Sequence, residues 1–241
     1  MKKDNLINIF KKSFSDFGKN LIITFPTILL FIFLILFSNI SVEINNLLNT
    51  NILLTIWLVI FSLISLAVIA FFFSGLIGMA YESVRKETKI GDMWSYSRRL
   101  WFKNFLIIFS VLIVYNILRY LAHNISLLIA YSLNLEANIA AGVFFVLYVA
   151  GLMGVIIFLT FSSFFLVIKN GGVWGSIKES ARLVKMEYLR TLSIILVFFV
   201  VNGALSLLDQ DAIVEVINTL FIIPYMALVL TRFVLNYDKV K

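Results

Sequence analysis

Four polar side chains recur at helical spacing inside one long apolar stretch of the sequence. Asn116, Arg119, His123 and Ser126 are separated by three, four and three residues, so an α-helix places them on one face. His123 is the single histidine of the chain. A guanidinium beside an amide and an imidazole is suited to binding an anion, either a solute or a lipid headgroup. Ionisable groups within membrane helices often mark such sites.

A structural role for Arg119 competes with this interpretation. Arg119 lies 15 residues after Asn104, about 22 Å along a helix, and a bilayer core is roughly 30 Å thick. The guanidinium would therefore lie near the far edge of the membrane. It could extend to the outer headgroups or pair with one of four acidic residues expected on that side, which are Glu136, Asp209, Asp211 and Glu215. This position favours the structural role.

The sequence lacks the residue sets of common catalytic sites. It has no cysteine, no P-loop, no HExxH and no GxSxG. One histidine cannot build a multi-histidine metal site. His123 and Ser126 are one helical turn apart, but no acid lies within sequence reach to orient them as a hydrolytic pair. We therefore expect no enzyme activity, no metal and no cofactor.

The overall composition places these residues in a membrane protein. The chain has 241 residues, of which 61% are hydrophobic and 14% charged, and its mean hydropathy is +1.02. Soluble domains are about half apolar and about a quarter charged, so the excess must face lipid. A membrane helix needs about 20 apolar residues. Six stretches qualify: Leu21–Val42, Ile52–Ala80, Phe105–Tyr131, Ile139–Ile168, Thr191–Leu208 and Ala212–Leu235.

The bases are distributed asymmetrically along this pattern. Nineteen of the 20 Lys and Arg residues lie on one side of the six-span pattern, and the turns within each pair of spans carry none. These nineteen bases lie in residues 2–19, 85–103, 169–190 and 232–241. Cytoplasmic loops retain such bases, so we expect a plasma-membrane protein with both termini in the cytoplasm. A five-span alternative would put the C-terminal bases outside. The first span is too long for a cleaved signal peptide.

The net charge of +7 could also indicate a nucleic-acid binder. We exclude that partner, because the bases lie beside the predicted spans, where they meet anionic lipid headgroups. Ten bases are the expected headgroup contacts: Lys11, Lys12, Lys19, Arg98, Arg99, Lys103, Lys178, Arg182, Lys185 and Arg190. The expected partners are membrane lipids and further membrane subunits or a second copy of the chain.

Amphipathic stretches precede the first, third and fifth spans. In the third of these stretches, Ile177, Ala181, Val184 and Tyr188 recur at helical spacing, and Ser176 with Glu179 resembles a capping box. Such helices can lie in the membrane interface with their bases among the phosphates. The alternative, which the composition favours, is that they connect the spans and pack beneath them.

The stretches also resemble one another. Lys19-Asn20-Leu21-Ile22-Ile23 is similar to Lys103-Asn104-Phe105-Leu106-Ile107, and Arg190-Thr191 begins a weaker third copy. The spacings are 84 and 87 residues. A single polytopic domain, residues 1–241, could therefore contain three hairpin repeats, residues 1–87, 88–172 and 173–241. The alternative is that any six-pass chain places bases before alternate spans.

Glycine and proline positions suggest packing rather than conduction. Gly75, Gly78, Gly142, Gly151 and Gly154 are expected to let neighbouring helices approach closely. The only two prolines, Pro26 and Pro224, fall in the first and last spans and are expected to bend them.

The segment Gly172-Val173-Trp174-Gly175-Ser176-Ile177-Lys178-Glu179-Ser180-Ala181-Arg182-Leu183-Val184 resembles a group of prokaryotic, often archaeal, six-helix membrane families of unassigned function. The group is similar to the membrane domain fused to some glycerophosphodiester phosphodiesterases. We expect no such catalytic domain within these 241 residues, so the resemblance implies no phosphodiesterase activity.

The sequence therefore predicts an all-α bundle of six transmembrane helices in three hairpins, with interfacial amphipathic helices on the cytoplasmic side. The predicted function is a non-enzymatic membrane subunit or scaffold that engages lipids or a membrane partner through its basic face. The alternative is a transporter component with a polar site around Arg119 and His123.

Overall fold

The computed structural model describes residues 4–47, 51–132, 137–207 and 211–238, and within these ranges it contains helices and no strands. The helices are α1 (Leu6–Lys19), the 3-10 turn η1 (Leu21–Thr24), α2 (Phe25–Leu47), α3 (Asn51–Ser83), α4 (Ile90–Ser132), α5 (Ala137–Leu159), α6 (Ser162–Lys169), α7 (Val173–Met186), α8 (Tyr188–Leu205), α9 (Asp211–Ile217), the π-helical turn η2 (Asn218–Ile222) and α10 (Ile223–Asp238).

Several of these helices can cross a bilayer, and the chain is a membrane protein. Five segments of the described residues are long and apolar enough to do so: Leu21–Asn45, Ile52–Ser83, Ile90–Ser132, Tyr188–Leu205 and Ile213–Asp238. The expected span Ile139–Ile168 is divided, because α5 ends at Leu159 and α6 begins only at Ser162. The six-pass count therefore remains a proposal.

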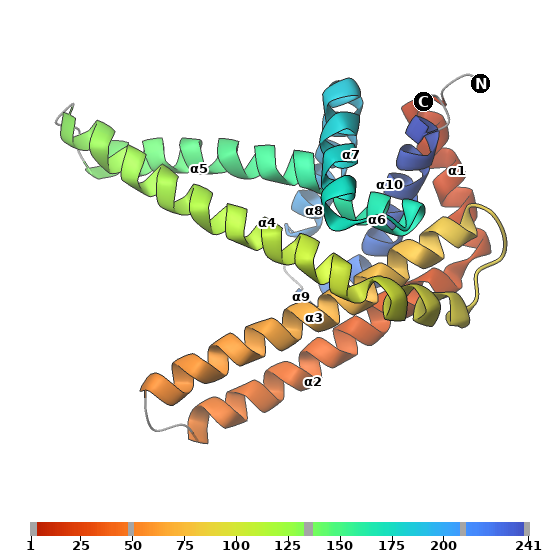
Figure 1. The fold of residues 1–241 in the computed structure, drawn as a ribbon, viewed down its shortest axis with the longest axis horizontal. Coiled ribbons are helices and arrows are strands. Elements are labelled where there is room, and N and C mark those ends of the chain that lie inside the picture. Colours follow the sequence, from red (N-terminus) through yellow and green to blue (C-terminus); the bar gives the residue numbers. More distant parts are fainter. Residues whose placement is uncertain (1–3, 48–50, 133–136, 208–210, 239–241) are drawn as a thin grey trace.

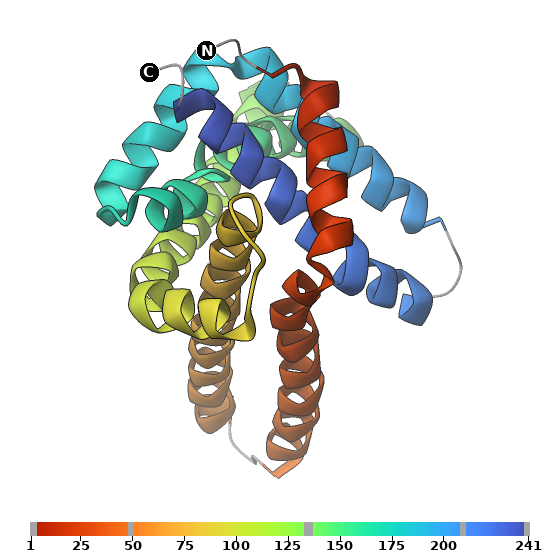
Figure 2. The same ribbon diagram turned by 90° about the vertical axis from the view of Figure 1, so that its right-hand side faces the viewer.

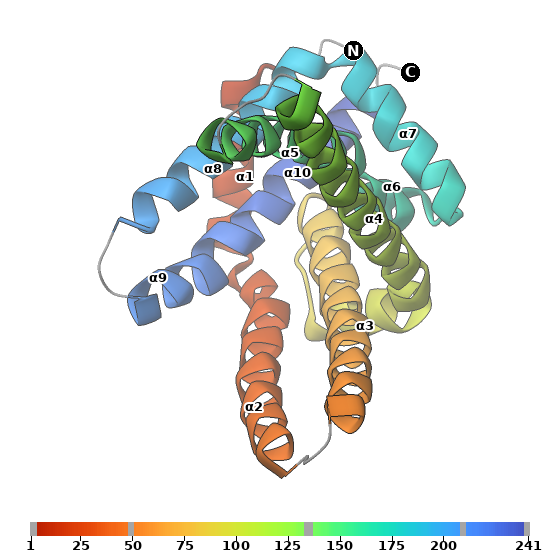
Figure 3. The same cartoon turned by 90° about the vertical axis from the view of Figure 1, so that its left-hand side faces the viewer.

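The helices form three arms that extend from a common hub (Figure 1). We call hub the region where α1, α6, α7, α10 and the first turns of α4 meet. In the first arm α2 and α3 lie side by side, with the rings of Phe37 and Phe61 stacked at 4.5 Å. In the second, α4 and α5 contact through Tyr115 and Tyr148. The third arm contains α8 and α9, and the arms point in different directions (Figure 3).

The hydrophobic core lies in the hub rather than between the arms. Every residue from Phe161 to Val167 is buried, and this segment includes most of α6. The largest buried rings, Phe161, Phe164, Phe165 and Phe233, belong to one cluster. Towards the tips of the arms the apolar side chains are exposed, as expected where lipid replaces protein as the neighbour.

The amphipathic helices supply part of this core. Ile9 on α1, Leu100 on α4 and Leu183 on α7 are buried in the same cluster, and Phe17 on α1 and Met93 on α4 are buried in an adjoining one. Figure 2 shows α1 packed across α10 at the hub. These helices therefore pack beneath the spans and are not free to lie flat on a membrane surface along their whole apolar faces.

The details of α7 differ from the expectation. Its buried residues are Ser176, Ser180, Leu183 and Val184, whereas Tyr188 is exposed. The capping-box prediction was wrong, because the helix begins before Ser176. Gly172 is the N-cap, and the Ser176 hydroxyl donates to the Gly172 carbonyl at 2.9 Å. The chain breaks between α6 and α7, with Asn170 in the left-handed conformation at φ 50°.

Two glycines of α3 let α4 approach its backbone. A Cβ added at Gly78 would lie 2.5 Å from the Cβ of Tyr96, and one added at Gly75 would lie 2.6 Å from the Cγ of Met93. By contrast, no atom of the described residues lies within 4 Å of a Cβ added at Gly142 or Gly154, so the close-packing prediction was wrong for these two.

We expect Gly78→Ala to lower the free energy of unfolding by about 1–3 kcal/mol, because α3 and α4 must separate to admit the methyl group. Gly142→Ala is the matched control and should be neutral or stabilising by about 0.5–1 kcal/mol, since alanine is the better helix former. Equilibrium unfolding in detergent measures both. Equal stability of the two variants would contradict the close α3–α4 contact.

The three repeat anchors occupy similar environments. Asn20, Asn104 and Thr191 are buried at 7%, 0% and 0% exposure. Three residues after each anchor stands an isoleucine, Ile23, Ile107 and Ile194, and these are buried at 0%, 2% and 0%. Equivalent positions of an internal repeat are expected to share such burial. The match in burial supports the threefold repeat, which remains a proposal.

Candidate functional site

The predicted polar face of α4 lines an open hollow on the second arm. The hollow has a volume of about 580 Å³ and is lined by Asn116, Arg119, Tyr120, His123 and, from α5, Phe144. Its polar residues are exposed. The helical spacing therefore correctly predicted that Asn116, Arg119 and His123 would share one surface, and that surface is not covered by another described helix.

Aromatic rings from α5 form the neighbouring wall. The ring of Phe144 meets the imidazole of His123 edge-on at 6.1 Å and stacks on Tyr148 at 5.6 Å. Tyr148 in turn meets Tyr115 at 5.7 Å. Phe144 and Tyr148 are four residues apart on α5, so both project towards α4. Sequence analysis missed these two residues, although their spacing is the signal that could have identified them.

Arg119 forms no ion pair with any carboxylate that the structure describes. Of the four acidic residues expected as partners, Glu215 is exposed and is not paired with it. Glu136 and Asp209 lie outside the described residues, as does the side chain of Asp211, so pairing with these three remains a prediction. The guanidinium is thus available for an anion within the described part of the arm.

Ser126 is separated from the hollow. It is 3% exposed, and its hydroxyl donates to the backbone carbonyl of His123 at 2.8 Å. The imidazole of His123 faces Phe144 instead. The geometry therefore does not bring the hydroxyl of Ser126 to the ring of His123.

A second group of candidate residues is the basic surface of the hub. Lys11 and Lys19 on α1 and Lys178, Arg182 and Lys185 on α7 are exposed. None of these five bases is paired with a carboxylate of the described residues, in contrast to Lys12, whose Nζ lies 2.7 Å from Asp4. Unpaired, exposed cations are the groups that an anionic surface can attract without first breaking an internal ion pair.

The remaining predicted headgroup residues interact with the protein itself. The guanidinium groups of Arg98 and Arg99 lie 6.0 and 5.1 Å from the rings of Trp94 and Tyr96. Lys103 donates to the Gly171 carbonyl at 3.2 Å. Arg190 has two partners within the protein, because it pairs with Glu187 at 3.2 Å and donates to the backbone carbonyl of Asp4. Arg190 therefore links the start of α8 to the segment before α1.

Exposed aromatic side chains accompany the bases. Trp174 on α7 is 76% exposed and Phe14 on α1 is 69% exposed. Trp101 and Phe102 on α4 are also exposed, next to Lys103. Aromatic side chains beside Lys and Arg are typical of the level at which hydrocarbon meets headgroups. The outer faces of three packed helices thus combine cations with aromatic anchors.

An ion pair between the first and last helices was not predicted. Nε of Arg232, on α10, donates a hydrogen bond to Oδ2 of Asp16, on α1, at 2.6 Å. The two residues are 216 positions apart in the sequence. The two side chains are only 14% and 19% exposed. Each residue was assigned to a separate basic segment, and no periodicity links positions so far apart.

Comparison with known proteins gives a family and no biochemical role. The chain matches the family described as "Domain of unknown function (DUF7847)" over residues 11–236. No curated protein and no solved structure matches it. Because the match covers nearly the whole sequence, the chain belongs to the DUF7847 family of unknown function.

Proposed function

We propose that this protein is a non-enzymatic membrane subunit whose basic hub binds anionic lipid headgroups on the cytoplasmic side of the plasma membrane. The observation that carries the proposal is the group of five exposed and unpaired bases on α1 and α7, namely Lys11, Lys19, Lys178, Arg182 and Lys185. Each Lys or Arg near an anionic leaflet contributes about 1 kcal/mol to membrane attraction.

The hub holds these bases in fixed positions. Their helices are buried on the opposite side, through Ile9 and Phe17 on α1 and through Leu183 and Val184 on α7. A packed helix presents its exposed cations without the entropic cost of ordering a flexible segment. The hub thus provides a rigid basic surface from which the three arms extend.

The orientation follows from the distribution of charge. The bases of the hub belong to the cytoplasm by the positive-inside rule. Both termini then lie in the cytoplasm, and the chain crosses the membrane six times, with α5 as the additional span. Further membrane subunits or a second copy could bind the exposed apolar surfaces of the arms.

Anionic lipid should stabilise the protein through the unpaired bases. In a neutral detergent, added phosphatidylglycerol should raise the unfolding temperature, and phosphatidylcholine should not. Lys178→Gln with Lys185→Gln removes about 2 kcal/mol of attraction, so we expect the shift to fall by roughly 4–8 °C.

A double variant with the same charge change is the control. Lys12→Gln with Lys86→Gln removes two bases that already have carboxylate partners, Asp4 at 2.7 Å and Glu82 at 3.4 Å. We expect this variant to keep most of the phosphatidylglycerol shift. A loss as large as that of the first variant would show that net charge, rather than the unpaired surface, governs the response.

The hollow on the second arm favours a second candidate function, that of a transporter component. The observation that favours this function is the hollow of about 580 Å³, which Asn116, Arg119 and His123 line. In this role Arg119 would bind an anionic solute within the membrane.

Single cysteines test the second candidate cleanly, because the chain has no cysteine of its own. For a solute pathway, water-soluble thiol reagents should label Asn116→Cys and His123→Cys in membranes. Leu121→Cys, 47% exposed on the opposite face of α4, should resist labelling because it faces hydrocarbon. Resistance of all three cysteines would remove the transporter alternative.

A further inference from the structure

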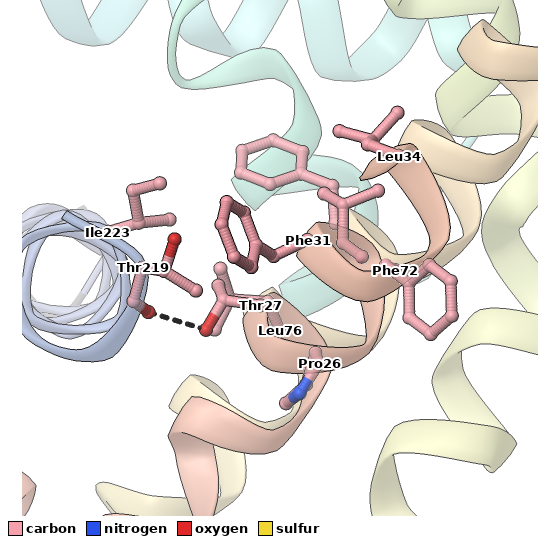
Figure 4. A pocket seen from close by; sticks show the side chains of 10 residues that line it. Pro26, Thr27, Phe31, Leu34, Phe72, Leu76, Thr219 and Ile223 are labelled. Atoms are coloured by element: carbon pink, nitrogen blue, oxygen red, sulfur yellow. Dashed lines mark hydrogen bonds between the residues drawn. The ribbon is translucent and has the colours of Figure 1, made fainter. Parts of the chain in front are cut away.

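An apolar groove lies where the first arm meets α10. Its volume is about 210 Å³. Figure 4 shows Phe31 of α2 directed towards Ile223 of α10. The lining residues are Pro26, Thr27, Leu30, Phe31, Leu34, Phe72, Phe73, Leu76, Thr219 and Ile223. All belong to the candidate membrane spans, so the groove lies at hydrocarbon depth.

A widened helical turn forms one wall of this groove. In η2 the amide of Ile223 donates to Asn218, five residues earlier, instead of to Thr219. The next residue that could serve the Thr219 carbonyl in a widened turn is Pro224, which has no N–H. Proline thus leaves this carbonyl without a donor in its own helix.

The hydroxyl of Thr27 reaches the Thr219 carbonyl from the neighbouring helix. Its oxygen lies 2.7 Å from this carbonyl, as the dashed line in Figure 4 shows, and also 2.7 Å from the Thr24 carbonyl, so the two acceptors share its one proton. Thr27 is 5% exposed. A buried carbonyl without a partner would cost about 1–3 kcal/mol. The Thr219 carbonyl in the wall therefore has a partner on the neighbouring helix. Widened turns of this kind often occur at functional sites.

We propose that this groove holds one hydrocarbon chain of an anionic membrane lipid. The spans that line it are surrounded by lipid, and half-buried residues such as Leu30 and Leu34 leave it open on one side. An apolar cavity of about 150 Å³ accepts a benzene-sized group, so this groove accommodates a segment of a lipid chain.

Charge complementarity at the adjacent end of the arm identifies the class of headgroup. Lys19 is exposed and unpaired among the described residues. It precedes Pro26 by seven residues, across the end of α1 and the 3-10 turn η1. A lipid whose phosphate lies at the level of Lys19 would have its chain at the level of the groove. This inference rests on the proposed binding of anionic lipids for its headgroup, but not for its chain.

Native mass spectrometry of the protein from nanodiscs containing equal phosphatidylglycerol and phosphatidylcholine tests the groove. We expect the wild type to retain one lipid, mainly phosphatidylglycerol, after transfer to detergent. Leu30→Phe fills the groove and should reduce the retained fraction about tenfold, because two or so methylene contacts are lost. Leu36→Phe makes the same change on the 59% exposed face of α2 and should have no effect.

Two further variants separate the groove from misfolding and from net charge. Leu30→Ala widens the groove, so it should retain lipid, whereas a merely destabilised arm would lose it. Lys12→Gln with Lys86→Gln removes two bases that already have carboxylate partners and should leave retention through the groove unchanged. Retention without headgroup preference would support the groove and count against the proposed headgroup binding. Equal retention by Leu30→Phe and Leu36→Phe would overturn the groove proposal, whatever the headgroup preference.

Discussion

Arg232→Ala is expected to lower the free energy of unfolding by about 1.5–3 kcal/mol, because it removes one member of a partly buried, hydrogen-bonded ion pair. The variant leaves the Asp16 carboxylate 14% exposed and without its guanidinium. The pair joins α1 to α10, so its loss should loosen the attachment of the N-terminal helix to the hub. Equilibrium unfolding in detergent, followed by tryptophan fluorescence, measures the change.

Two comparisons distinguish the ion pair from a general effect of charge. Lys12→Ala breaks a more exposed pair, with side chains 51% and 36% exposed, and should cost no more than about 1 kcal/mol. Asp16→Leu with Arg232→Met should recover much of the lost stability, because apolar residues replace both charges. If Arg232→Ala costs no more than Lys12→Ala, the pair does not hold α1 in place.

Phe233→Ala is expected to lower the free energy of unfolding by about 3–5 kcal/mol, the usual cost of removing a buried phenyl ring. Phe233 is 1% exposed and packs against Phe161 with ring centroids 5.6 Å apart. The guanidinium of Arg190 lies 5.8 Å from the same ring. The substitution therefore opens a cavity where α6, α8 and α10 meet.

Phe199→Ala provides the matched control on an arm. Phe199 is 62% exposed on α8 and should contribute little to folding, since detergent or lipid replaces its contacts. Thermal unfolding of both variants in the same detergent compares hub with arm. Similar losses for Phe233→Ala and Phe199→Ala would contradict the location of the core in the hub.

The sequence was most informative where periodicity or charge carries the signal. Apolar length identified the regions of α2, α3, α4, α8 and α10, since each corresponds to a candidate span. The three-four spacing also placed Asn116, Arg119 and His123 on one surface. These properties depend on local helix geometry and on the cost of burying charge, and both can be judged from residues that are close together in the sequence.

Features that depend on contacts between helices could not be derived in this way. The break after Leu159 lies in a continuously apolar stretch, so hydropathy does not distinguish α5 from the buried α6. The groove is similarly hidden, because Phe31 in its wall and a lipid-facing phenylalanine have the same composition signal. Long-range contacts also determine which glycines allow close helix packing, since Gly78 faces Tyr96 whereas Gly142 faces open space.

The prolines show how local chemistry acts through tertiary context. Both were expected to bend spans, but Pro26 is the second residue of α2, where a helix has no internal use for its N–H. Pro224 is the second residue of α10 and follows the widened turn η2. Because Pro224 has no N–H to offer the Thr219 carbonyl, the hydroxyl of Thr27, 192 positions away in the sequence, provides a donor to that carbonyl.

The most direct test of the account is the side of the membrane on which the hub lies. Four serines that the structure leaves exposed, Ser15 and Ser95 at the hub and Ser132 and Ser206 at the arms, can each be changed to cysteine in a chain without cysteine. An impermeant thiol reagent added to intact cells should label Ser132→Cys and Ser206→Cys only. Labelling of Ser15→Cys or Ser95→Cys from outside would contradict a cytoplasmic hub that binds anionic lipid.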